Sequence, residues 1–278
     1  MLHERKQKRN IAVPVLALAL TLLCACGTRP SVPEEQQETP NISQASVSPA
    51  STPAPTPTPA PTPVPTPAPT PRPERVEDDY FADAAFFGNS LVDGLHSFGG
   101  LDQASFFAGT SASVISVESV KDMRLSDGSS GTLLDALLEE DHGKIYVLLG
   151  INELGFNVDS FVDMYEDLLD KIQTDQPQAQ IYVMALTPIT KWRSDADPLF
   201  TRDRVQDFNT AIQTMAEEEG YIYLDLFDAL SDDAGFLPED HSTDGVHFTV
   251  STYLDWAEYL RQNYDGAAEV TFYKESED

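Results

Sequence analysis

The sequence is short of cysteine and of basic residues. Its two cysteines, Cys24 and Cys26, both lie near the N-terminus of a 278-residue chain, so the rest of the chain holds no disulfide and no thiol chemistry. Lys and Arg together number 17 against 46 Asp and Glu, a formal net charge of −29. A chain this acidic repels nucleic acid and anionic bilayer surfaces, so we expect no nucleic-acid partner and a neutral or cationic substrate.

Recognisable cofactor and metal motifs are also missing. The glycines at 88, 94, 99 and 100 form no GxGxxG pattern, and no P-loop occurs. No group of His, Cys and Asp residues has the spacing of metal ligands. We therefore expect a site that works without a metal or another cofactor.

Residues 1–26 have the pattern of a bacterial signal peptide. Basic residues at positions 5 to 9 precede an apolar run over 11–23, which is too short for a retained membrane span. The run ends in Leu23-Cys24-Ala25-Cys26-Gly27, which resembles the lipobox of bacterial lipoproteins. The resemblance implies that Cys26 is acylated and becomes the mature N-terminus, with the domain lipid-anchored on the extracytoplasmic side of the cell membrane. The alternative is an ordinary signal peptide cut at an A-x-A-like site.

Residues 27–75 have the composition of a disordered linker. They are rich in Pro, Ser, Thr and Gln and become a Thr-Pro and Ala-Pro alternation. Such a segment has too few apolar side chains to fold, and its prolines forbid helices and sheet ladders. In the expected polyproline II state, residues 52–73 would reach roughly 70 Å at about 3.1 Å per residue. We interpret this segment as a spacer between the anchor and a folded domain.

Residues 76–278 alternate strand-like and helix-like segments, and about 200 residues suffice for one domain. Short apolar runs predict strands at Tyr80–Phe87, Ala104–Ala108, Lys144–Leu149, Gln180–Leu186 and Tyr221–Leu226, with a possible extra strand at Glu269–Tyr273. Helical periodicity marks Leu133–Leu138, Val158–Gln173, Phe200–Glu219 and Thr252–Asn263. Wholly apolar strands separated by helices indicate a parallel sheet covered on both faces. We predict an α/β fold, a three-layer α/β/α sandwich around a mainly parallel five-stranded sheet.

Chemically useful residues follow the predicted strands, at the edge where such sheets bind ligands. The first strand ends in Gly88-Asn89-Ser90, and Ser90 would begin a helix whose free amides favour negative charge on a nearby oxygen. Gly109 follows the second strand and would leave a backbone N–H accessible. Asn152 follows the third strand, and its side-chain amide could point toward Ser90. Taken singly, each also has a structural explanation as a helix cap or a turn residue.

Asp244 and His247 are three residues apart in the loop before the last predicted helix. That spacing lets the carboxylate reach the imidazole nitrogen that faces away from a substrate, which fixes the tautomer and stabilises the imidazolium. A serine hydroxyl is a poor nucleophile until a base takes its proton, and His247 could do so near neutral pH.

In this order, the blocks GNSL, a glycine after the second strand, GINE and DGVH resemble the SGNH (GDSL-type) hydrolase family over about residues 80–261. The resemblance implies the SGNH/flavodoxin-like version of the sandwich, with Ser90 as nucleophile, His247 as base and Asp244 as its partner. It also implies an oxyanion hole formed by Ser90, Gly109 and Asn152. Ala112 could align in place of Gly109, and Asn89 and Glu153 depart from the usual Asp at their positions.

These features predict a cell-surface serine esterase that hydrolyses small acyl esters, with acetyl groups on carbohydrate as one candidate substrate. Two alternatives stay open, namely an O-acyltransferase that acts on a surface polysaccharide and a non-catalytic binding lipoprotein on the same fold. Trp192 and Arg193 are expected in a loop after the fourth strand, where loops tend to contact substrate. The indole there could stack on a sugar or simply pack onto the loop.

Overall fold

The computed structural model of the chain describes residues 75–264. The predicted signal peptide with Cys26, the linker up to residue 74 and the possible strand Glu269–Tyr273 lie outside the described residues. Within them, no helix combines the length and the apolar character that crossing a membrane requires.

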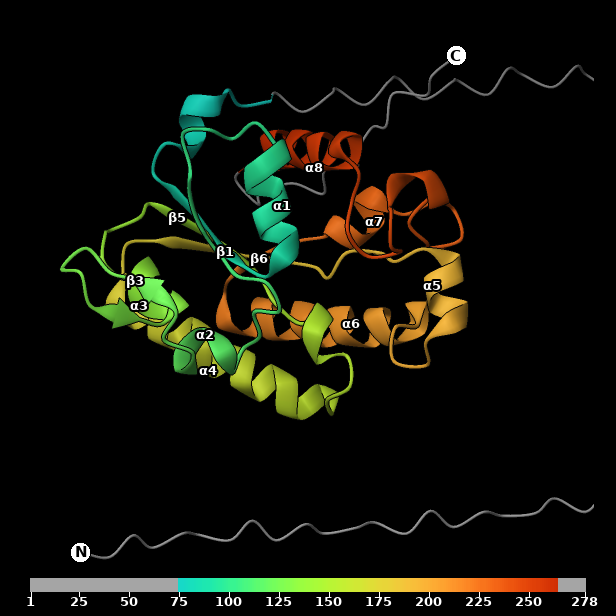
Figure 1. Cartoon of the computed structure of the whole chain (residues 1–278), viewed down its shortest axis with the longest axis horizontal. Helices are drawn as coiled ribbons and strands as arrows, with labels where there is room; N and C mark the ends of the chain where they lie inside the picture. The colour runs from blue at the N-terminus through green and yellow to red at the C-terminus, as the bar shows by residue number, and fades with distance from the viewer. Residues whose placement is uncertain (1–74, 265–278) are drawn as a thin grey trace, which may run out of the picture. The chain divides into compact units, whose positions relative to one another are not determined.

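A five-stranded, all-parallel sheet forms the centre of the described domain (Figure 1). The strand order is β2-β1-β5-β6-β7, which is the flavodoxin-like order of doubly wound sheets. All five predicted strands are present, and their bounds are β1 Ala84–Gly88, β2 Ser105–Ala108, β5 Lys144–Leu148, β6 Gln180–Met184 and β7 Ile222–Leu224. The predicted fold class is therefore confirmed.

Helices cover both faces of the sheet, with α1 and α8 on one side and α4 and α6 on the other (Figure 1). The helices are α1 Ser90–Phe98, α2 Ser116–Ser119, α3 Leu133–Leu137, α4 Val158–Asp175, α5 Lys191–Ala196, α6 Arg202–Glu219, α7 Leu226–Leu230 and α8 Val250–Gln262. The described domain also contains three short 3-10 turns, which are η1 Asp78–Phe81, η2 Ile151–Glu153 and η3 Glu239–His241. A small antiparallel hairpin is formed by β3 Met123–Arg124 and β4 Ser130–Gly131.

The predicted first strand began too early. Its N-terminal part, from Tyr80, belongs to the turn η1, and β1 starts only at Ala84. Phe81 is nevertheless fully buried, with its ring centroid 6.2 Å from that of Phe86. Burial of an aromatic side chain does not distinguish a turn under the sheet from a strand within it, which explains the error.

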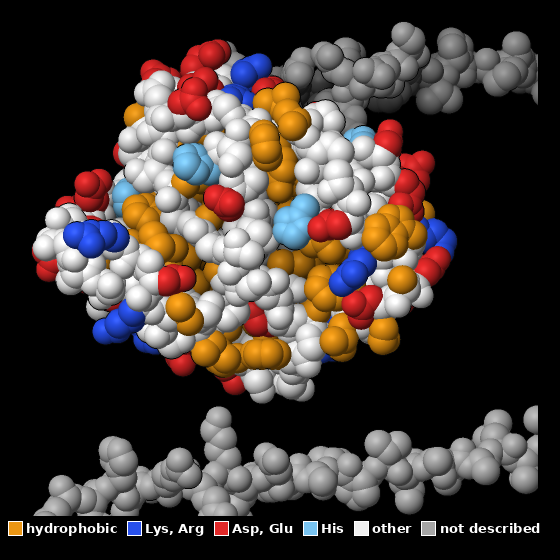
Figure 2. Space-filling model, in the orientation of Figure 1, with side chains coloured by type: hydrophobic (Ala, Val, Ile, Leu, Met, Phe, Trp, Pro, Cys, Tyr) orange, Lys and Arg blue, Asp and Glu red, His pale blue; other side chains and the backbone are white. Residues whose placement is uncertain are grey.

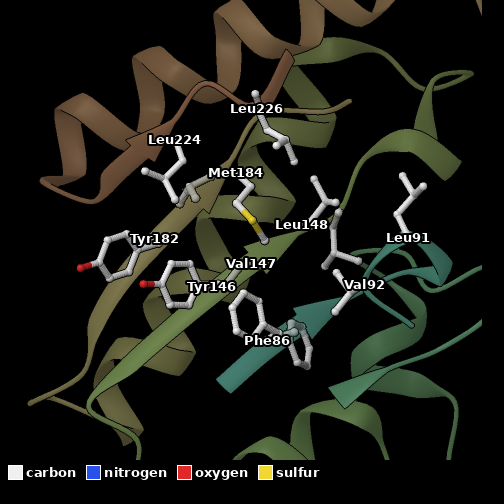
Figure 3. Packing of buried hydrophobic residues seen from close by; sticks show 14 of the residues in the cluster. Phe86, Leu91, Val92, Tyr146, Val147, Leu148, Tyr182, Met184, Leu224 and Leu226 are labelled. Atoms are coloured by element: carbon white, nitrogen blue, oxygen red, sulfur yellow. The ribbon is translucent and has the colours of Figure 1, made fainter. Parts of the chain in front are cut away.

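A ladder of stacked rings crosses the sheet and forms part of the core, and Figure 3 labels three of them, Phe86, Tyr146 and Tyr182. Phe106, Phe86, Tyr146 and Tyr182 are register partners on four neighbouring strands. The centroid separations from one ring to the next are 5.0, 4.7 and 4.3 Å, with interplanar angles of 13 to 14°. Phe86, Tyr146 and Tyr182 are fully buried, and burying each of them stabilises the fold by about 1.5–3 kcal/mol. The ladder fixes the register of the strands whose ends carry the candidate site.

Candidate active site

The residues singled out in the sequence gather where β1 and β5 lie side by side. The chain leaves β1 toward β2 on one side and returns to β5 on the other, so this is the point where the winding of the sheet reverses. Ser90 follows β1 and Asn152 follows β5, while the loop before α8 brings Asp244 and His247 to the same edge. Ligands of doubly wound sheets bind at such a point.

Ser90 is the first residue of α1 because Asn89 caps that helix. The Asn89 side-chain oxygen accepts a hydrogen bond from the Leu91 amide at 2.9 Å. A side chain at Gly88 would collide with the Leu148 carbonyl oxygen, so only glycine lets β1 approach β5 this closely just before the serine. Among the described residues, the Ser90 amide has no hydrogen-bond acceptor. A free N–H at a helix start favours negative charge on an adjacent oxygen.

The structure joins Ser90, His247 and Asp244 in one chain of hydrogen bonds. Ser90 Oγ lies 2.8 Å from His247 Nε2, and His247 Nδ1 lies 2.7 Å from Asp244 Oδ2. An ionised carboxylate only accepts hydrogen bonds, so Nδ1 carries the hydrogen and Nε2 is left to accept from the serine hydroxyl. The His247 and Asp244 side chains are 44% and 53% exposed, so the imidazole is open to solvent and to a large substrate.

Asp244 is held as a carboxylate by the residues that follow it. Its Oδ1 accepts hydrogen bonds from the amides of Val246 at 3.0 Å and His247 at 2.8 Å. Partial burial acts to raise the pKa of Asp244, but the hydrogen bonds from the His247 side chain and from these amides outweigh it and lower the pKa below its ordinary value. The group beside the imidazole is therefore negatively charged at neutral pH.

The loop after β2 is held against η2 by two consecutive residues. Asn152 Nδ2 donates to the Ala112 carbonyl at 2.8 Å, and the Val114 amide donates to Glu153 Oε1 at 2.7 Å. Ser111 lies between the strand and these contacts at φ 60°, the only described non-glycine residue at positive φ. A conformation of that kind persists where surrounding contacts impose it, and such positions cluster at functional sites.

Gly109 does not provide the free amide that the sequence led us to expect. Its N–H donates to the Gly88 carbonyl at 3.1 Å, as a continuation of the β1–β2 ladder. The Ala112 amide, the alternative donor, closes a turn onto the Gly109 carbonyl at 3.1 Å. Asn152 contacts Ala112 and not Gly109, so Ala112 is the loop residue nearer to the side-chain amide.

Glu153 is a buried acid beneath this loop. Its side chain is 1% exposed, and its second oxygen, Oε2, is buried without a hydrogen-bond partner. Burial raises the pKa of Glu153 to about 7, against the opposing effect of the Val114 amide and other backbone donors. The sequence showed this residue only as a departure from a motif, because a contact across 39 residues leaves no local signal.

Trp192 and Arg193 lie on a helix, contrary to the expected loop. Both belong to α5, whose N-cap Thr190 accepts a hydrogen bond from the Arg193 amide. No residue of α5 is buried, so the segment has no apolar face from which the sequence could have predicted a helix. Within residues 75–264, no group of His, Cys, Asp or Glu side chains is arranged to hold a metal ion.

Comparison with known proteins places this site in context. A family model described as the GDSL-like lipase/acylhydrolase family matches residues 86–254. A protein from Streptococcus pneumonia, provisionally named a platelet activating factor, has a similar fold with a TM-score of 0.54 and 22% identity, covering 64% of this chain and 81% of its own. A GDSL-like lipase from Bacteroides thetaiotaomicron has a TM-score of 0.51 and 13% identity, covering 70% of this chain and 92% of its own. A comparison with curated proteins gives no match.

Proposed function

Because the chain belongs to the GDSL-like lipase/acylhydrolase family, and is a carboxylic ester hydrolase, we propose that it is a serine esterase using Ser90, His247 and Asp244 to release small acyl groups. One observation carries the proposal, the continuous hydrogen-bond chain from Ser90 Oγ through the His247 imidazole to Asp244. Ser90 at the start of α1 and His247 in the loop before α8 are 157 positions apart, so local sequence preference does not account for their alignment.

The reaction begins when Ser90 Oγ attacks the ester carbonyl carbon and its proton passes to His247 Nε2. Asp244 stabilises the imidazolium that forms and keeps the ring oriented through Nδ1. His247 then returns the proton to the leaving alcohol oxygen as the C–O bond breaks, which leaves an acyl-enzyme on Ser90. Water, activated by the same imidazole, attacks the acyl carbon, and the free acid departs as the serine regains its proton.

Negative charge develops on the former carbonyl oxygen during each attack. The Ser90 amide is one donor for it, because that N–H is free at the start of α1. Asn152 Nδ2 is a second, because its bond to Ala112 occupies only one of its two N–H groups. A third donor could come from the Gly109 or the Ala112 amide; each is already bonded, to the Gly88 and Gly109 carbonyls respectively, so either would have to exchange that acceptor for the oxyanion. Each such donor contributes about 10²–10³ in rate.

The open position of the imidazole supports a large alcohol. With about half of the His247 and Asp244 side chains exposed, the alcohol side of the ester can belong to a polymer. Figure 2 shows acidic side chains spread over the visible face of the domain, and Asp and Glu outnumber Lys and Arg by 46 to 17 in the sequence, which disfavours a polyanionic substrate. Attachment through Cys26 and the proline-rich linker would place the enzyme at the outer surface of the membrane, within reach of wall polymers.

The proposal is tested with p-nitrophenyl acetate and the purified chain. Wild type should release p-nitrophenol with saturation, and a fluorophosphonate probe should label Ser90. Ser90→Ala should lower kcat by at least about 10³-fold and abolish labelling, while thermal unfolding stays unchanged. Hydrolysis that persists in Ser90→Ala, or labelling at another residue, would contradict the assignment. Radiolabelled palmitate incorporation in a bacterial host, compared between wild type and Cys26→Ala, tests the lipid anchor.

A further inference from the structure

Trp192 is a large aromatic side chain exposed beside the candidate catalytic residues. It is 46% exposed, whereas the chain's other tryptophan, Trp256, is fully buried in the core. The Cζ2 edge of its indole lies so close to Gly245 that a Cβ built there would be 3.0 Å away. Gly245 directly follows Asp244 and is two residues before His247. One edge of the indole therefore lies against the loop that carries Asp244 and His247, which we call the triad loop, while much of the ring faces solvent.

The backbone that carries Trp192 is firmly held in this place. The Thr190 amide donates to the Gly245 carbonyl at 3.0 Å, and the Trp192 amide donates to Glu239 Oε1 at 3.2 Å. On the other side of α5, the Arg193 guanidinium stacks over the Phe200 ring at 4.5 Å and pairs with Asp197 at 3.1 Å. These contacts fix the first turn of α5 to the loop that carries Asp244 and His247. An aromatic side chain on a fixed backbone loses less conformational freedom when it binds a ligand than one on a mobile loop.

The surroundings of the indole favour a sugar over a hydrocarbon chain or a protein partner. Charged groups flank it on α5 and η3, namely the Lys191–Asp195 pair at 2.6 Å and Glu239. A fatty acyl chain needs a continuous apolar groove, and a protein partner needs an apolar patch of several hundred Å². A pyranose ring instead offers an apolar C–H face to an aromatic plane and a rim of hydroxyls to charged neighbours. The net charge of −29 further favours a neutral sugar over an acidic one.

We propose that Trp192 is the platform on which the sugar unit of an O-acylated neutral polysaccharide stacks while its ester lies at Ser90. This inference rests on the proposed esterase function and names the alcohol side of its substrate. The position of the indole against Gly245 sets the sugar on the His247 side of the site, where the leaving alcohol must receive its proton. Trp192 is thus a specificity residue that binds the part of the substrate remaining after the acyl group is transferred.

A binding measurement tests the platform independently of catalysis. In Ser90→Ala, which cannot turn over the ester, Trp192 is the exposed fluorophore and Trp256 is shielded. Partly O-acetylated xylo-oligosaccharide should produce a saturable blue shift and reduce acrylamide quenching. The response should vanish in Ser90→Ala/Trp192→Phe. Unacetylated xylo-oligosaccharide should also protect the indole, whereas ethyl hexanoate should not. Protection by the hexanoate and not by the sugars, or no protection by any probe, would overturn the proposal.

A kinetic comparison gives a second test. Trp192→Ala should lower the ratio of kcat/KM for acetylated xylo-oligosaccharide to kcat/KM for p-nitrophenyl acetate by about tenfold, chiefly through KM. Leu254→Ala removes an equally exposed apolar side chain from α8, 48% exposed, and should leave the ratio unchanged. Equal losses on both substrates in Trp192→Ala would show a structural role and contradict the platform. Failure of the esterase assignment itself would appear differently, as hydrolysis of the small ester that survives Ser90→Ala.

Discussion

Ser242 is tied to His247 by a hydrogen bond from its hydroxyl to the His247 carbonyl oxygen at 2.6 Å. The same Oγ accepts a hydrogen bond from the Gly245 amide at 2.8 Å, and Ser242 also forms an isolated antiparallel bridge with Phe248. One hydroxyl therefore closes the loop that contains Asp244 and His247, without contacting the imidazole itself. Ser242 is in this sense a positioning residue for the triad.

Replacing Ser242 by alanine should impair catalysis through the position of His247. The variant loses two hydrogen bonds within the loop, which costs about 1–2 kcal/mol of stability. Because the imidazole is then held less firmly in its position, kcat should fall by about 10–100-fold, with KM for a small ester nearly unchanged. Ser242→Thr keeps the hydroxyl and should restore most of kcat. Steady-state kinetics with p-nitrophenyl acetate and urea unfolding measure both effects; a Thr variant as impaired as the Ala variant would contradict the hydrogen-bonding role.

Asn152 should be required for stabilising the oxyanion. Asn152→Ala removes the Nδ2 donor and its bond to the Ala112 carbonyl, so kcat should fall by about 10²–10³-fold. Asn152→Asp retains the shape but offers a carboxylate where a donor is needed, and it should lose at least as much. Asn152 is exposed, so neither variant should change the thermal unfolding midpoint by more than a few degrees. Near wild-type kcat in Asn152→Asp would exclude a donor role for this side chain.

The sequence predicts the sheet well because wholly apolar strands between helices leave few alternatives. Each strand of the central sheet is present, and the parallel arrangement then brings the ends of β1 and β5 to one edge. Ser90 and Asn152 could be expected to converge for that reason alone. The position of the loop with Asp244 and His247 at the same sheet edge could be expected only from the resemblance to the SGNH family, because that position depends on how α8 packs back onto the sheet.

Other parts of the site depend on contacts that leave no pattern in the sequence. The bond between Glu153 and the Val114 amide joins loops 39 residues apart, and the occupied N–H of Gly109 is a detail of how β2 extends beside β1. The helix α5 is short and wholly unburied, so its sequence has no helical periodicity to detect. These features are set by tertiary packing, and they include the residue for which we propose a role in substrate choice.

Glu153 should make the stability of the protein depend on pH. Burial raises its pKa from an ordinary 4.5 to about 7, so the folded state holds the proton more tightly than the unfolded state does. The contribution of this group is fully present below about pH 4.5 and is lost as the pH rises through about 7. Glu153→Gln is neutral throughout and keeps an oxygen for the Val114 amide. Relative to this variant, wild type should lose on the order of 3 kcal/mol between pH 4.5 and 8.

The measurement is urea unfolding of both proteins at several pH values across that range. Other titrating groups are common to the two proteins, so the difference between their free energies of unfolding isolates Glu153. A difference that stays constant from pH 4.5 to 8 would show that Glu153 titrates at its ordinary pKa in the folded protein.

An added methyl group at Gly245 should destabilise the protein by forcing α5 and the triad loop apart. Its φ is +87°, and a Cβ there would lie 2.6 Å from Arg193 Cβ and 2.8 Å from Thr190 Oγ1. Gly220 is the matched control, because its φ is +78° and a Cβ would meet nothing within 4 Å. Both alanine variants carry the same backbone strain, about 1–2 kcal/mol. Only Gly245→Ala adds a collision, which should cost about a further 1–3 kcal/mol.

The two variants should also differ in activity, since the collision can be relieved only by moving α5 or the Asp244–His247 loop. Gly245→Ala should therefore lower kcat/KM for p-nitrophenyl acetate by about tenfold or more, whereas Gly220→Ala, at the C-terminal end of α6, should leave it unchanged. Urea unfolding and steady-state kinetics on the same preparations separate the two effects. Equal destabilisation of both variants, with full activity in Gly245→Ala, would mean that the loop and α5 move independently. The conclusion that Trp192 is held in a fixed position beside Asp244 and His247 would then be wrong.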